Sequence, residues 1–116
     1  MSDALITLRD ALRSFAAERD WEQFHTPRNL AVALSVEAGE LLEHFQWMDE
    51  GASTLLSADK RMQIGEEMAD VLLYLIRLAD KLDVDLVDAA RGKLQLNALK
   101  YPAEKVRGSS KKYTEY

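Results

Sequence analysis

Apolar residues recur at intervals of three and four along most of the chain, and few residues interrupt this pattern. The 116 residues include only five glycines and two prolines, and no stretch alternates apolar and polar residues for long enough to form a strand. Side chains spaced by three and four lie on one face of an α-helix. The sequence therefore predicts an all-α fold, and its length allows one hydrophobic core.

Start and stop signals divide the chain into four predicted helices. The second helix begins at Pro27 after the capping residue Thr26, and Gly51 is expected to end it. Ser57 is the expected cap of the third helix, and Asp83 or Asp85 that of the fourth. The predicted helices cover residues 3–20, 27–50, 58–82 and about 84–101. They predict a four-helix-bundle-like subunit over residues 1–102, followed by a polar, basic tail over residues 103–116.

The charge balance and the missing cysteines exclude several classes of protein. The 15 basic and 20 acidic residues give a net charge of −5, which argues against a protein that binds nucleic acid by neutralising phosphates. The chain has no cysteine, so thiolate nucleophiles and Cys-ligated metal sites are excluded. No apolar run approaches the roughly 20 residues of a membrane span, and the first residues lack the basic region of a signal peptide. We expect a cytoplasmic protein with no membrane or nucleic-acid partner.

Two pairs of acidic residues fall on or beside the apolar faces of the second and third predicted helices. Glu37 lies within the apolar stripe, and Glu40 lies at its edge with His44 one turn further on. Glu67 and Asp70 share a face of the next helix, and antiparallel packing would bring the two pairs together. Unpaired carboxylates in apolar surroundings require a cation. Four carboxylates without cysteine suit Mg²⁺, with Mn²⁺ as a substitute, although Glu-x-x-Glu also occurs by chance on charged helices.

Aromatic and polar outliers elsewhere are candidates for contacts to a ligand with a flat apolar part. Trp21 and His25 lie in the first connector, and Trp47 follows the acidic pair of the second helix. These aromatic rings could stack on a nucleotide base, or they could simply pack under a loop. Further along the chain, the Asn97 amide could contact a base or sugar or could form a structural bridge, and Lys93 could contact a phosphate or could be solvated. Basic residues of the tail could also reach a phosphate. Asn97 and Tyr101 join Trp21, His25 and Trp47 as candidates for base and sugar contacts. The weaker candidates, for the pocket or the phosphates, are Tyr74, Lys93 and Lys112.

These residues resemble the MazG-like group of all-α nucleoside triphosphate pyrophosphohydrolases, and within it the dCTP pyrophosphatase branch. The resemblance extends from about Phe15 to Glu115. The acidic motif is typical of the wider group, and the aromatic segments favour the branch. The segments that carry the resemblance are AERDWEQFH at 17–25, PRNL at 27–30, EAGE at 37–40, FQW at 45–47, EMAD at 67–70, Tyr74, Lys93, Asn97, Tyr101–Pro102 and SSKKYTE at 109–115.

The resemblance implies hydrolysis of a nucleoside triphosphate between its α and β phosphates, with dCTP or a 5-modified dCTP preferred and dCMP and pyrophosphate as products. Glu37, Glu40, Glu67 and Asp70 would hold Mg²⁺, and Glu40 is our choice for the carboxylate that accepts a proton from the attacking water. The resemblance also implies a homo-oligomer built as a dimer of dimers. Two alternatives remain open at this point: a house-cleaning pyrophosphatase of broad specificity, and a non-catalytic helical module whose acidic face binds a protein.

Overall fold

The computed structural model describes residues 3–110 and residue 114, and it is helical throughout with no strand among these residues. This confirms the predicted all-α fold. The four long helices lie where the apolar periodicity places them, and three short helical turns join or follow them. The elements are α1 (Asp3–Glu18), the 3₁₀ turn η1 (Glu22–Phe24), α2 (Pro27–Glu43), α3 (Glu50–Ser53), α4 (Ala58–Lys81), α5 (Leu86–Lys100) and α6 (Ala103–Val106).

The predicted capping residues begin three of these helices. The Thr26 side chain accepts a hydrogen bond from the backbone N–H of Asn29, and Pro27 occupies the first helical position of α2. Ser57 accepts in the same way from Lys60 at the start of α4, and Asp85 caps α5. Each cap provides a partner for a backbone N–H that the helix itself leaves unpaired.

The predicted end of the second helix is wrong. α2 ends at Glu43 instead of continuing to Gly51, because the next backbone groups form tighter bonds, such as that from His44 N–H to the Leu41 carbonyl. The aromatic residues that follow have lower helix propensity than the alanine and leucine before them. Gly51 lies inside the short helix α3. The predicted tail also begins with a helical turn, α6.

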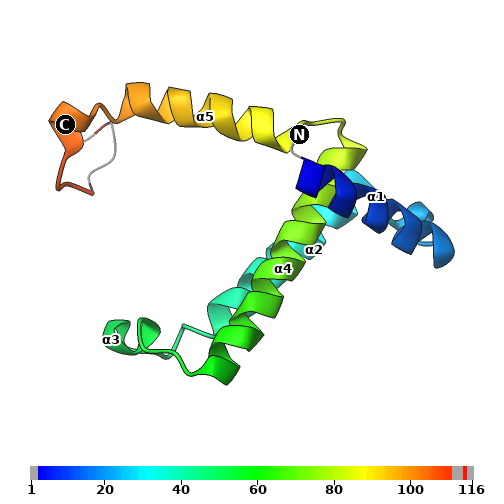
Figure 1. Ribbon diagram of the computed structural model, residues 1–116, viewed down its shortest axis with the longest axis horizontal. Coiled ribbons are helices and arrows are strands. Elements are labelled where there is room, and N and C mark those ends of the chain that lie inside the picture. The colour runs from blue at the N-terminus through cyan, green and yellow to red at the C-terminus, as the bar shows by residue number, and fades with distance from the viewer. Residues whose placement is uncertain (1–2, 111–113, 115–116) are drawn as a thin grey trace. The chain divides into compact units, whose positions relative to one another are not determined.

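The chain divides after Val84 into two compact units. In the first unit, α4 packs against both α2 and α1, and Figure 1 shows α2 and α4 side by side. Leu30 on α2 and Ile76 on α4 are the large side chains that this packing buries fully. The second unit holds α5 and α6. The predicted domain boundary at residue 102 stays a prediction.

The apolar stripe predicted for α4 is only partly covered by this chain. Met68, Leu75 and Leu82 belong to that stripe and are exposed, whereas Ile76 and Arg77 on another side of the helix are buried. The difference arises because α4 carries apolar residues on more than one face, and α1 and α2 cover only part of its circumference.

No helix among the described residues has the length and hydropathy that crossing a membrane requires.

Candidate functional site

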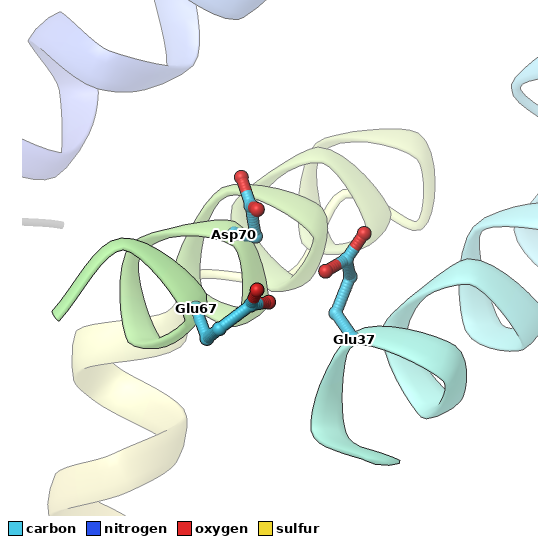
Figure 2. Close-up of side chains that lie close together, drawn as sticks. All are labelled: Glu37, Glu67 and Asp70. Atoms are coloured by element: carbon cyan, nitrogen blue, oxygen red, sulfur yellow. The ribbon is translucent and has the colours of Figure 1, made fainter. Parts of the chain in front are cut away.

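Three of the four predicted acidic residues converge between α2 and α4. Glu37 extends from α2, and Glu67 and Asp70 extend from α4 one turn apart. One carboxylate oxygen of each residue lies within 4.8 Å of the other two. Figure 2 shows the three carboxylates facing a common space between the two helices. We call Glu37, Glu67 and Asp70 the acidic cluster.

The acidic cluster is electrostatically unfavourable by itself. Glu37 Oε2 and Glu67 Oε2 are buried and have no hydrogen-bond partner among the described residues. Burial, followed by the neighbouring Glu40, raises the pKa of Glu37 to about 7. Burial also raises the pKa of Glu67, and the charge of Glu40 adds to this effect. Carboxylates that lack partners and repel one another would be stabilised by a cation between them.

The chemistry of this donor set fits a hard divalent cation. The cluster offers oxygens from three carboxylates, which are the ligands that Mg²⁺ and Mn²⁺ prefer. Two of its residues, Glu37 and Glu67, each have a buried oxygen without a hydrogen-bond partner among the described residues. Glu40 is not one of the three converging residues, but it is close enough to raise the pKa of both Glu37 and Glu67. It lines a second cavity together with His44 and Glu67. The sequence predicts Glu40 as a fourth metal ligand. Glu40 lies beside the acidic cluster, and its role as a ligand stays a prediction.

We expect the free energy of unfolding of the metal-free protein to fall as the pH rises from about 4.5 to about 7. In this window the folded state keeps a proton on Glu37, whose pKa is raised from 4.5 to about 7, and the unfolded chain releases it. Unfolding therefore releases a proton, so a higher pH favours the unfolded state until the folded state loses the proton as well. Denaturant unfolding in the presence of a chelator, at pH 5 and pH 7.5, measures this change.

The Glu37→Gln variant is the control for this pH dependence. Its side chain cannot titrate, so the fall in stability between the two pH values should be smaller than in the unmodified chain. An equal fall in both proteins would contradict the assignment of the effect to Glu37.

An open pocket of about 450 Å³ adjoins the acidic cluster in the first unit. Asp70 is a member of the acidic cluster and also lines the pocket. The Trp21 ring makes edge-to-face contacts with Phe15, at a centroid distance of 5.7 Å, and with His25, at 6.3 Å. The size and the mainly apolar lining suit an organic ligand with a flat ring. The lining residues are Leu8, Ala11, Leu12, Phe15, Trp21, His25, Asp70, Leu73, Tyr74 and Arg77.

Sequence reasoning missed Arg77. Its side chain is only 4% exposed and lines the pocket, although a buried arginine is rare. A signal for it was present, because Asp70, Tyr74 and Arg77 are separated by four and three residues and so share one face of α4. All three residues line the pocket.

The pocket of the first unit does not test the other predicted ligand contacts. Trp47 follows α2 in the turn before α3 and is 89% exposed, so it does not line the pocket. Lys93 and Asn97 lie on α5, and Tyr101 follows its last residue, so all three belong to the second unit. Lys112 lies outside the described residues. The roles of these five residues stay predictions.

The first unit thus combines an all-α fold with a cluster of three carboxylates and an adjoining aromatic pocket. The chain belongs to the MazG-like family, whose sequence pattern matches residues 32–116. This confirms the family resemblance found in the sequence.

Named relatives agree with this assignment. The chain is 50% identical to human dCTP pyrophosphatase 1 over 94% of its own length and 67% of the human protein. Mouse dCTP pyrophosphatase 1 is 47% identical over the same shares. Among solved structures, a pyrophosphatase from Archaeoglobus fulgidus is 37% identical with a TM-score of 0.71, and the match covers 88% of this chain and 95% of that one.

Proposed function

We propose that this chain hydrolyses dCTP, or a 5-modified dCTP, to dCMP and pyrophosphate in a reaction that requires Mg²⁺. The observation that carries the proposal is the convergence of Glu37, Glu67 and Asp70 beside an aromatic pocket that shares Asp70. A nucleoside triphosphate has a flat base and a polyanionic end, which match these two adjacent features. The similarity to dCTP pyrophosphatases supports the choice of base.

Each part of the site would have a separate task. Glu37, Glu67 and Asp70 would hold Mg²⁺, which when bound neutralises charge on the triphosphate and activates water for attack. Trp21 and Tyr74 would bind the base, because they line the apolar part of the pocket. Glu40 would accept the proton from the attacking water, since it lies beside the acidic cluster without being one of its three converging members.

A substrate panel tests this proposal. Each of the four canonical dNTPs is incubated with the protein in Mg²⁺, and again with a chelator, and kcat/KM is measured for each. We expect the highest kcat/KM for dCTP, no turnover in the chelator, and an inactive Glu40→Gln variant. Similar turnover of several dNTPs would indicate the broad-specificity pyrophosphatase, and no turnover of any dNTP would favour the non-catalytic helical module.

We also propose that the chain forms a homo-oligomer, as a dimer of dimers. Large apolar side chains are exposed on α2, α4 and α5, among them Val36, Met68 and Leu99. Exposed apolar surface of this kind on a helix is often covered by another protein chain. Sedimentation analysis should give the mass of a tetramer, and a monomer of 13.1 kDa at micromolar concentration would contradict the proposal.

A further inference from the structure

Arg77 is held by acceptors on two elements of the first unit. Its Nε donates to His25 Nδ1 at 3.1 Å, and one of its terminal nitrogens donates to a Glu22 carboxylate oxygen. A second terminal nitrogen lies 3.5 Å from Asp80 Oδ2. The guanidinium therefore connects α4 to the connector that contains η1, and it does so almost entirely shielded from solvent, since the side chain is 4% exposed.

The partners of Arg77 are themselves fixed by other charged residues. Glu22 also forms an ion pair with Lys81, and Asp80 accepts two hydrogen bonds from Arg13 on α1, at 2.6 and 2.8 Å. Because both carboxylates are held by a second cation, Arg77 has little freedom to turn away from His25. A lysine could not satisfy these three acceptors, since its ammonium is a single point charge without the planar fork of arginine.

The hydrogen bond from Arg77 determines where the proton on the His25 ring lies. An arginine Nε is always a donor, so His25 Nδ1 must be unprotonated to accept from it. The ring is then neutral and carries its hydrogen on Nε2. Burial, and next the charge of Arg77, lower the pKa of His25, which keeps the ring in this form at neutral pH. Nε2 has no partner in the part of the chain that the structure describes, and His25 lines the pocket.

We propose that Arg77 is a positioning residue that fixes His25 as a neutral Nε2–H donor, and that this donor recognises a hydrogen-bond acceptor on the base. The acceptor is a carbonyl oxygen or an unprotonated ring nitrogen, both of which cytosine offers. The identity of the ligand rests on the proposed function, whereas the state of the His25 ring does not. The charged groups that surround His25 are Arg77 and Lys81 from α4 and Glu22 from η1.

NMR of the histidine rings tests the positioning role directly. The chain has two histidines, so His44 serves as an internal reference in the same spectrum. In the unmodified protein, ring nitrogen shifts should show His25 as a single Nε2–H form that protonates only below the pH usual for a histidine. In Arg77→Lys the ring should become a mixture of both neutral forms and protonate at a higher pH. An Nδ1–H ring in the unmodified protein, or a spectrum unchanged by the substitution, would overturn the proposal.

Steady-state kinetics with dCTP test the recognition role. We expect Arg77→Lys to raise KM by about two- to threefold, because only part of the protein would then carry the His25 hydrogen on Nε2, with kcat changed much less. His25→Gln keeps an amide N–H near the position of Nε2, so it should retain a lower KM than His25→Asn, which is too short to reach. Equal KM values for the two His25 variants would contradict recognition through Nε2–H.

The two measurements separate this proposal from the proposed function. If the unmodified protein hydrolyses no nucleotide, the proposed function fails, and the ring spectrum still decides whether Arg77 fixes His25. If Arg77→Lys does not fold, the comparison of His25→Gln with His25→Asn decides the recognition role, because both variants remove the same acceptor of Arg77.

Discussion

Glu37→Gln should lower kcat/KM for dCTP by about 10³-fold, equivalent to about 4 kcal/mol of transition-state stabilisation. Glu37 is the only member of the acidic cluster that α2 contributes, and glutamine supplies a neutral oxygen in its place. Without the third carboxylate the site would bind a divalent cation weakly, and the triphosphate would meet uncompensated negative charge. The measurement is steady-state kinetics at several Mg²⁺ concentrations.

The same substitution should stabilise the protein when no metal is present. Burial and the charges of Glu40, Asp70 and Glu67 raise the pKa of Glu37. A neutral side chain at this position removes the repulsion between the buried carboxylates. We expect the Glu37→Gln variant to be inactive and, in chelator, more stable than the unmodified chain. Added Mg²⁺ should stabilise the variant less than it stabilises the unmodified chain.

Glu66→Gln is the matched control for the loss of a carboxylate. Glu66 is an exposed glutamate on α4 next to Glu67 and is not part of the acidic cluster. Glu66→Gln makes the same chemical change outside the acidic cluster. Its activity and its response to Mg²⁺ should therefore stay close to those of the unmodified chain. A Glu37→Gln variant as active as Glu66→Gln would contradict the assignment of the site.

Trp21→Ala should raise KM for dCTP by about 10- to 100-fold, the effect expected for the loss of one aromatic stacking partner of a base. Trp21 lines the pocket and is oriented by its edge-to-face contact with Phe15, at 5.7 Å between ring centroids. The effect on kcat should be smaller, because the proposed contact of the indole is with the base and not with the reacting phosphates. Initial rates over a range of dCTP concentrations separate the two parameters.

Phe24→Ala provides the control for this prediction. Phe24 is an aromatic residue of the same connector, but it is 58% exposed and does not line the pocket. Its removal should leave KM nearly unchanged, and Trp21→Phe should restore part of the affinity lost in Trp21→Ala. A folded Trp21→Ala protein with an unchanged KM would show that the base binds elsewhere.

The acidic cluster was predictable because one of its residues violates the helical pattern and the other two flank the apolar stripe of the next helix. Glu37 occupies an apolar position of α2, and an acidic residue at such a position requires a compensating partner. The structure brings Glu37, Glu67 and Asp70 together, and their role as metal ligands stays a prediction. Sequence periodicity gives the direction of each side chain on its own helix, and that was sufficient here because α2 and α4 pack directly on each other.

Arg77 and the exposed stripe of α4 were not predicted, and both have the same cause. The periodicity of α4 identifies its most apolar face, but it does not say which neighbouring helix covers which face. Arg77 is buried because α1 and the connector approach α4 on the side of Asp70 and Tyr74. Met68 and Leu75 remain exposed on another side. Packing partners are therefore the information that a single sequence lacks.

Product analysis by ³¹P NMR shows whether the acidic cluster supports hydrolysis between the α and β phosphates of dCTP. dCTP is incubated with the protein in Mg²⁺, with the protein in chelator, and with Glu37→Gln in Mg²⁺. We expect dCMP and pyrophosphate to form in equal amounts in the first sample and neither product in the other two. Formation of dCDP and orthophosphate, or of any product at an unchanged rate in chelator, would contradict the account.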